Sequence, residues 1–180
     1  MNPMKLEFPE KKHEQQYLEM IQEFADIHEK IIPWSAELKK WENYNDFLER
    51  IQNYKEGKNI KPWRWKSELY FLMDNKDKIV WAEIIRYELT EELRYDAGNV
   101  GYGIRPSERK KWYATRGLNL VLEKCKEYGL KKILLTCNKE NIWSAKTIIK
   151  NWWIWNSEYN HICDDHPKWI LKERYWILIK

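Results

Sequence analysis

The fold of this chain is decided by residues 101–115, which read Gly101-Tyr-Gly-Ile-Arg-Pro-Ser-Glu-Arg-Lys-Lys-Trp-Tyr-Ala-Thr115. The pattern predicts a short strand that ends at Ile104, then a basic loop, then the start of a helix. Backbone N–H groups at a helix N-terminus point at one spot, and Arg109, Lys110 and Lys111 add positive charge beside it. Three basic residues alone more often mark a solvated surface, but this context favours an anion site that suits a pyrophosphate.

Apolar periodicity before this stretch predicts two helices and a β-hairpin. Residues 13–31 and about 43–55 carry apolar side chains every three or four positions, and Gly57 fits the left-handed cap that ends many helices. Residues 69–73 and 79–87 are apolar runs separated by a polar turn, which is typical of an antiparallel hairpin.

After the basic loop, the pattern predicts alternating helices and strands. A helix over about 110–128, capped by Ser107 or a neighbour, ends at Gly129. Its inward face comprises Leu118, Val121, Leu122 and Cys125. A buried strand over 133–137, a helix over 142–150 and strands around 154–159 and 169–178 follow. The expected fold class is α/β in the mixed α+β sense, one domain over residues 1–180 with a central, mostly antiparallel mixed sheet flanked by helices.

Composition narrows the functional classes. The net charge of +4 comes from 32 basic and 28 acidic residues that are intermixed, so the excess is too small to indicate nucleic acid. No apolar run reaches the roughly 18 residues of a membrane span, and the N-terminal residues lack a signal core. We therefore expect a cytoplasmic chain without membrane contact. The three cysteines have no CxxC spacing, which favours reduced thiols in a reducing compartment. Residues 161–166 offer no closed four-ligand set, so no metal is expected.

Two motifs resemble the GNAT superfamily of acetyltransferases. Its acetyl-coenzyme A motif is a strand followed by Arg/Gln-x-x-Gly-x-Gly/Ala, and this chain reads Arg109-Lys-Lys-Trp-Tyr-Ala114. A second element, Asn-x-x-Ala/Ser followed by a helix and Lys-x-Gly, is matched by Asn141, Ser144 and Lys150, with Trp152 in the place of glycine. Residues 32–35 (Ile-Pro-Trp-Ser) and 174–177 (Arg-Tyr-Trp-Ile) resemble landmarks of one bacterial subgroup, so the resemblance covers nearly the whole chain.

The resemblance implies acetyl transfer from acetyl-coenzyme A, bound along the strand that ends at Ile104, to a primary amine by direct attack. Glu83, expected on a strand facing the groove, is the candidate base. The family often uses a tyrosine as the acid, but Ile148 occupies that position, so Tyr102 and Tyr159 are the alternatives. The implied cofactor-binding residues are Tyr102, Gly103, Ile104, Arg109, Lys110, Lys111, Trp112, Tyr113, Ala114, Thr115, Asn141, Ser144 and Lys150.

Tryptophan stands at several positions where the family needs glycine. The chain has 12 Trp and 6 Gly, whereas average usage of about 7% would give about 13 glycines. An indole at Trp112 obstructs the close backbone approach that a phosphate requires. Two explanations are open: a deliberately substituted variant, or a gene from a lineage that reads UGA as glycine, translated with UGA as tryptophan. We favour the second hypothesis, on which the positions that stand for glycine are Trp41, Trp63, Trp81, Trp112, Trp143, Trp152, Trp153 and Trp169.

On that hypothesis Trp34 and Trp176 are genuine tryptophans, whereas Trp65 and Trp155 stay open. Two other functional classes also stay open. One is a GNAT-fold protein that binds acyl-coenzyme A or a partner without catalysis, and the other is a stacking surface for single-stranded nucleic acid around residues 63–66. The acceptor pocket is expected around residues 32–38 and 159–166, the acceptor amine is not identified, and an oligomer is possible.

Overall fold

The computed structural model describes the backbone of residues 3–30, 33–60, 65–95, 97–151, 154–163 and 166–179. The side chains of residue 34 and of residues 151–170 lie outside this description. Along the chain the elements are β1 (Lys5–Glu7), η1 (Lys11–His13), α1 (Glu14–Asp26), η2 (Trp34–Ala36), α2 (Tyr44–Glu56), β2 (Ser67–Met73), β3 (Ile79–Arg86), α3 (Glu91–Tyr95), β4 (Val100–Ile104), η3 (Pro106–Glu108), α4 (Tyr113–Glu127), β5 (Lys132–Asn138), α5 (Ile142–Asn151), β6 (Ile154–Cys163) and β7 (His166–Leu178).

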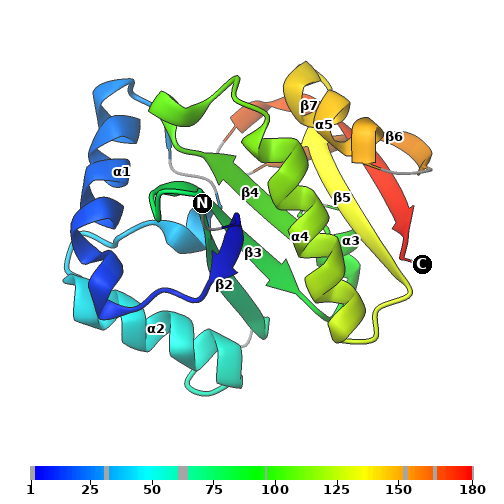
Figure 1. Ribbon diagram of the computed structural model, residues 1–180. Helices are drawn as coiled ribbons and strands as arrows, with labels where there is room; N and C mark the ends of the chain where they lie inside the picture. The colour runs from blue at the N-terminus through cyan, green and yellow to red at the C-terminus, as the bar shows by residue number, and fades with distance from the viewer. Residues whose placement is uncertain are drawn as a thin grey trace.

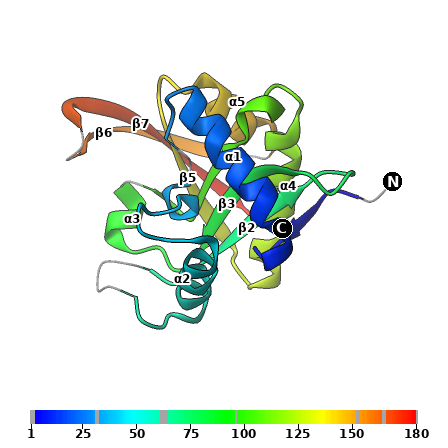
Figure 2. The same cartoon turned by 90° about the vertical axis from the view of Figure 1, so that its left-hand side faces the viewer.

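The strands form two antiparallel sheets, which confirms the mixed α+β class and divides the expected central sheet in two. One sheet has the order β1-β2-β3-β4 and the other the order β5-β7-β6 (Figure 1). The predicted hairpin is present as β2 and β3, with a register shift between Leu72 and Met73. The β6–β7 hairpin extends beyond the helices, as Figure 2 shows.

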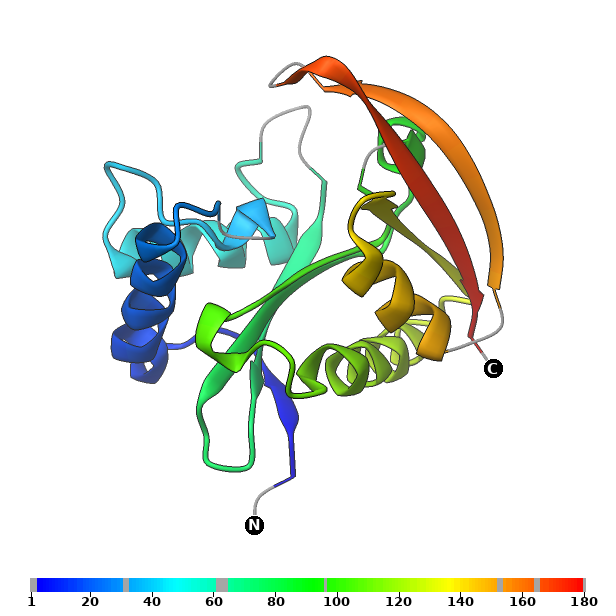
Figure 3. The same cartoon turned by 90° about the horizontal axis from the view of Figure 1, so that it is seen from above.

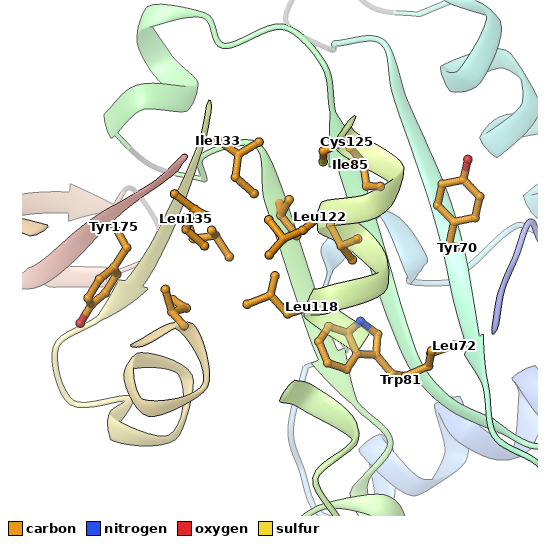
Figure 4. Packing of buried hydrophobic residues seen from close by; sticks show 14 of the residues in the cluster. Tyr70, Leu72, Trp81, Ile85, Leu118, Leu122, Cys125, Ile133, Leu135 and Tyr175 are labelled. Atoms are coloured by element: carbon orange, nitrogen blue, oxygen red, sulfur yellow. The ribbon is translucent and has the colours of Figure 1, made fainter. Parts of the chain in front are cut away.

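Helices cover both faces of the first sheet. Helices α1 and α2 pack on one face, where Tyr17, Phe47 and Phe71 are fully buried. Helices α4 and α5 lie on the opposite face (Figure 3). There the expected inward residues of α4 are buried together with Trp81 and Leu72 of the sheet (Figure 4). Within the described residues, no helix combines the length and the apolar character that a bilayer-spanning segment requires.

Among the described residues, the two sheets are joined by backbone hydrogen bonding at one place, between Asn99 and β5. The N–H of Asn99 donates to the carbonyl of Leu134 in β5 (2.7 Å), and the side chain of Asn99 accepts from the N–H of Leu134 (2.8 Å). Gly98 has φ +63°, and a β-carbon on it would lie 2.3 Å from the Leu134 carbonyl oxygen. Only glycine permits this approach, so Gly98 fixes the point from which β4 and β5 separate.

Helix boundaries differ from the sequence expectation at two places. Helix α1 ends at Asp26, several residues before the expected end, and His28 has φ +55°. Helix α4 begins at Tyr113 and not near Lys110, because Lys110 and Trp112 have φ of +64° and +67°, which a right-handed helix excludes.

Three further local features differ or were not expected. Ser107 does not cap α4 but lies within the η3 turn. The predicted cap of α2 at Gly57 is present (φ +71°), and the structure adds an N-terminal cap at Asn43. Strand β1 and helix α3 were not predicted, because three and five residues are too few for a periodic pattern.

Candidate active site

Strand β4 has one paired edge and one free edge. The N–H of Arg105 donates to the carbonyl of Val80 (3.0 Å), so alternate residues of β4 bond to β3. By the same alternation, the backbone groups of Tyr102 and Ile104 point away from β3, toward the side of β5. No group within the described residues pairs with them. An extended chain can therefore bind along this edge as an added strand.

The free edge leads into a loop of unpaired backbone donors. Between η3 and the first turn of α4, the N–H groups of residues 110–115 form no hydrogen bond within the described part of the chain. Positive φ angles at Lys110 and Trp112 turn the chain here. Unpaired N–H groups at the N-terminus of a 15-residue helix are donors that an anion could accept from, and the anion site itself stays a prediction of the sequence.

Trp112 is the residue of this loop that immediately precedes α4. Its backbone is left-handed (φ +67°, ψ +2°), a conformation that is costly for any bulky residue and free for glycine. The side chain is 67% exposed, and the ammonium of Lys150 at the end of α5 lies 4.0 Å from the ring centroid. The indole thus engages, by a cation–π contact, the lysine that the family motif assigns to the cofactor.

The basic side chains of the loop are mostly paired with carboxylates. Arg109 forms two hydrogen bonds with Glu29, just beyond α1 (2.9 and 2.6 Å), and these raise the pKa of Arg109. Lys111 pairs with Glu108 of η3 (2.9 Å). Lys110 is exposed and has no ion pair within the described residues. An anion bound at this loop would therefore contact backbone donors more than the side chains of the basic cluster.

Tyr102 connects β4 to the N-terminus of α5. Its hydroxyl lies 2.8 Å from the hydroxyl oxygen of Ser144, and the side chain of Asn141 accepts from the N–H of Ser144 (3.1 Å). Burial raises the pKa of Tyr102 to about 12, although the contact with Ser144 opposes this shift. The structure thus brings three of the expected site residues together, with Tyr102 protonated at neutral pH.

Glu83 does not face an open groove, so that expectation is wrong. It lies directly opposite Tyr102 in the β3–β4 register, but its side chain is fully buried and neither carboxylate oxygen has a partner within the described residues. Burial raises the pKa of Glu83 well above its usual range. Its neighbours at alternate positions of β3, Trp81 and Ile85, pack in the cluster with α4, so Glu83 lies on the α4 side of the sheet.

The structure also describes one of the two other positions considered for the catalytic acid, Ile148, but not the side chain of the second, Tyr159. Ile148, where the family acid would stand, is fully buried in the core between α5 and the sheet. Tyr159 lies outside the described side chains, as do those of residues 161–166. Gly103 pairs with Ala82 in the ladder, and Tyr113, Ala114 and Thr115 form the first turn of α4, half-buried beside the loop.

Sequence reasoning missed the acidic side chains of the α1 region that contact the loop. Glu23 binds Arg105 and the N–H of Ser107, and Glu29 binds Arg109. The sequence carries only a weak signal for these contacts, because the two glutamates are about 80 residues away from their partners.

Comparison with known proteins identifies the family. A model described as an acetyltransferase (GNAT) domain matches residues 5–151. A search of curated proteins finds no significant match.

Solved structures of low identity share the fold over their whole length. A spermidine N-acetyltransferase from Vibrio cholerae in complex with CoA and spermine is 16% identical, covering 98% of this chain and 95% of that chain at a TM-score of 0.63. A putative acetyltransferase from Salmonella typhimurium with its cofactor acetyl-CoA is 11% identical (99% and 95% covered, TM-score 0.65). A Salmonella typhimurium acetyltransferase that modifies the N-terminal serine of ribosomal protein L7/L12 is 10% identical (100% and 97% covered, TM-score 0.63).

The family match covers most of the chain, and the fold, the free β4 edge and the open α4 N-terminus agree with it. The chain belongs to the GNAT family of acetyltransferases.

Proposed function

We propose that this protein is an N-acetyltransferase that moves the acetyl group of acetyl-coenzyme A to a primary amine. The observation that carries the proposal is that two stretches of unpaired backbone, the free edge of β4 and the loop before α4, follow each other along the chain. The free edge of β4 leads, through the short η3 turn, to the loop whose N–H groups, residues 110–115, are unpaired within the described residues. A pantetheine arm followed by a pyrophosphate needs both stretches in this order.

The backbone fits the cofactor, whereas one side chain does not. Positive φ at Lys110 and Trp112 turns the loop so that its N–H groups stand free, as a phosphate requires. The indole of Trp112 belongs to the same loop and is in cation–π contact with the ammonium of Lys150. Glycine at position 112 keeps the backbone conformation and removes the obstruction, which agrees with the hypothesis that this position is glycine in the natural protein.

Acetyl-coenzyme A supplies an activated thioester, and the protein positions it for direct attack by the amine. The N–H groups of Tyr102 and Ile104 point into the space beside β4 and can donate to the oxyanion of the tetrahedral intermediate. The phenol of Tyr102 holds its proton at neutral pH and can donate it to the departing thiolate. Because Glu83 is enclosed, we assign removal of the amine proton to water.

We place the acceptor on the α1 side of β4, near the turn formed by residues 33–36. Pro33 is buried there beside Gly101, and the two side chains of the predicted acceptor region that follow, Ser35 and Ala36, are also buried. The comparison proteins with this fold are described with a polyamine and with a protein N-terminus, so both classes belong in an acceptor panel.

The test compares the chain as written with W112G, and uses W41G as the matched control. Trp41 is also exposed (83%), but it lies in the loop before α2. We expect W112G to bind coenzyme A at least about tenfold more tightly than the parent, and W41G to match the parent. W112G should also release free thiol from acetyl-coenzyme A when spermidine or a peptide with N-terminal serine is added.

Two results would count against the proposal. If W112G fails to bind coenzyme A, the loop is not the pyrophosphate site. If W112G binds coenzyme A but turns over no amine, the protein is a binding module, an alternative favoured by the buried Ile148 at the position of the family acid.

A further inference from the structure

The turn that precedes the phosphate loop is attached to α1 by one carboxylate. Nε of Arg105 donates to Oε1 of Glu23 (2.7 Å), and the backbone N–H of Ser107 donates to Oε2 of the same side chain (3.0 Å). Glu23 lies in the third turn of α1, and its partners begin the η3 turn. A single carboxylate therefore binds one side chain and one backbone donor of the segment between β4 and the phosphate loop.

Water cannot easily replace the Glu23 carboxylate as the partner of Arg105. The side chain of Arg105 is only 5% exposed, with Nη1 donating weakly to the carbonyl of Ile79 (3.4 Å) and Nη2 3.5 Å from Glu19. A buried guanidinium that loses its main carboxylate is costly, because its desolvation is no longer offset. Arg105 and Glu23 thus restrict the positions that the η3 turn can adopt.

Glu23 is charged under ordinary conditions. Partial burial alone would raise the pKa of Glu23, but the hydrogen bonds from Ser107 and Arg105 lower it more, so the net shift is downward. Its side chain is 26% exposed, which limits screening by solvent. The bonds to Arg105 and to the N–H of Ser107 are therefore charge-assisted at neutral pH.

The opposite side of the same turn is held independently. The carboxylate of Glu108, 6% exposed, accepts from Lys78 of the β2–β3 turn and from Lys111 of the loop. Two anchors, Glu23 and Glu108, thus fix the turn between the end of β4 and the start of the loop. The anchor at Glu23 differs because it comes from α1, which packs on the opposite face of the sheet from α4.

We propose that Glu23 is a positioning residue for coenzyme A: through Arg105 and the N–H of Ser107 it holds the loop so that residues 110–115 present their N–H groups together. This inference rests on the proposed function, since it concerns the same cofactor site. It also links the two substrates, because the helix that fixes the cofactor loop belongs to the acceptor side of the sheet.

The sign of the effect separates positioning from simple electrostatics. Glu23, Glu19 and Glu29 are all negative and all lie near a site for an anion. If only their charge mattered, removing any of them would strengthen binding of coenzyme A. Positioning predicts the opposite for Glu23 alone, because Glu29 pairs with an exposed arginine and Glu19 makes only the longer contact with Arg105.

The first measurement is calorimetric titration of coenzyme A into W112G and into W112G carrying E23A, E23Q, E19Q or E29Q. We expect E23A to raise Kd about tenfold, and E23Q, which keeps one acceptor oxygen of the two, to fall between E23A and the parent. E19Q and E29Q should leave Kd unchanged or lower it. In turnover, the Glu23 variants should raise KM for acetyl-coenzyme A and leave kcat within about twofold.

The second measurement is amide hydrogen exchange in the chain as written, with and without E23A, at Ser107, Glu108 and Arg109, whose N–H groups are hydrogen-bonded in the η3 turn. It needs no cofactor. Positioning requires faster exchange at these residues and unchanged exchange in α2. Unchanged exchange at Glu108 and Arg109 overturns the inference, as does a Glu23 variant that binds coenzyme A as tightly as its W112G parent. Failure of the W112G parent itself to bind coenzyme A contradicts instead the proposed function.

Discussion

The indole of Trp81 in β3 lies directly against the backbone of Gly117 in α4, where a β-carbon on Gly117 would be 2.8 Å from the ring. Figure 4 shows Trp81 beside this helix. Trp81 is fully buried, and its ring nitrogen has no hydrogen-bond partner within the described residues. The two positions therefore share one small volume between the sheet and the helix, and they should be energetically coupled.

A double-mutant cycle on this pair should show strong non-additivity. G117A should destabilise the chain as written, because overpacking of about 1–3 kcal/mol exceeds the gain of about 1 kcal/mol from replacing glycine in a helix. In the W81G background, where removal of the indole costs about 3–5 kcal/mol, the same G117A should stabilise. Urea unfolding of the four proteins measures the coupling, with N119A on the exposed face of α4 as the control. Additive effects would show that the helix and sheet readjust freely.

The source gene is expected to carry UGA codons at positions 81, 112 and 152, and UGG codons at 34 and 176. Trp112 has the φ of a glycine, whereas Trp176 is half-buried in β7 with Lys132 4.9 Å from its ring centroid, as a native tryptophan packs. Reading these five codons decides the matter. Five UGG codons would mean that the indoles are native, and the non-catalytic function would then be preferred.

Replacing Glu83 by methionine should stabilise the protein above about pH 4.5. The folded state keeps the buried carboxyl protonated above the pH at which the unfolded chain releases that proton. The unfolded state then binds fewer protons than the folded state, so the stability of the parent falls as pH rises. E83M removes this dependence of stability on pH and also removes the two unpaired carboxylate oxygens. The difference in unfolding free energy between E83M and the parent should therefore shrink toward pH 4.

Urea unfolding at pH 4, 6 and 8 tests this prediction. C125S, at the neighbouring buried thiol, is a suitable control because it changes polarity in α4 without removing the carboxyl. Equal pH slopes for the parent and E83M would mean that Glu83 is ionised and hydrated in the folded state.

Removing the phenol of Tyr102 should slow catalysis more than binding. In the W112G background, Y102F should lower kcat about 100-fold, the typical lower value for loss of a general acid, with Kd for coenzyme A changed less than about threefold. Steady-state kinetics and calorimetry measure the two quantities. S144A keeps the phenol but removes its partner at 2.8 Å, so it should retain most of the activity. If Y102F has a normal kcat, a group other than the Tyr102 phenol donates the proton to the thiolate.

Local sequence patterns predicted the elements that surround the site. The hairpin of β2 and β3, the β4 strand and the inward face of α4 follow from short-range periodicity, which depends on neighbouring residues only. The motif 109–114 also identified the loop and the family.

The rest depends on contacts between distant parts of the chain. Glu83 alternates as an outward strand residue would, but α4 covers it, so its burial is set by a helix about 40 residues later. The pairing of Arg109 with Glu29 bridges 80 residues and has no local signature. The late start of α4 follows from two positive φ angles at non-glycine residues, which propensity alone excludes.

The contact between Asn99 and Leu134 joins the two sheets at the start of β4, so it is the point about which β4 and β5 would rotate relative to each other. Because strands rise about 3.3 Å per residue, Tyr102 lies about 10 Å and Ile104 about 17 Å along β4 from this contact, so each degree of rotation of one sheet about it would displace them by about 0.2 and 0.3 Å. A ligand lying along β4 would therefore meet the larger variation in spacing at its nucleotide end, beyond Ile104, and a smaller variation at its reacting end beside Tyr102.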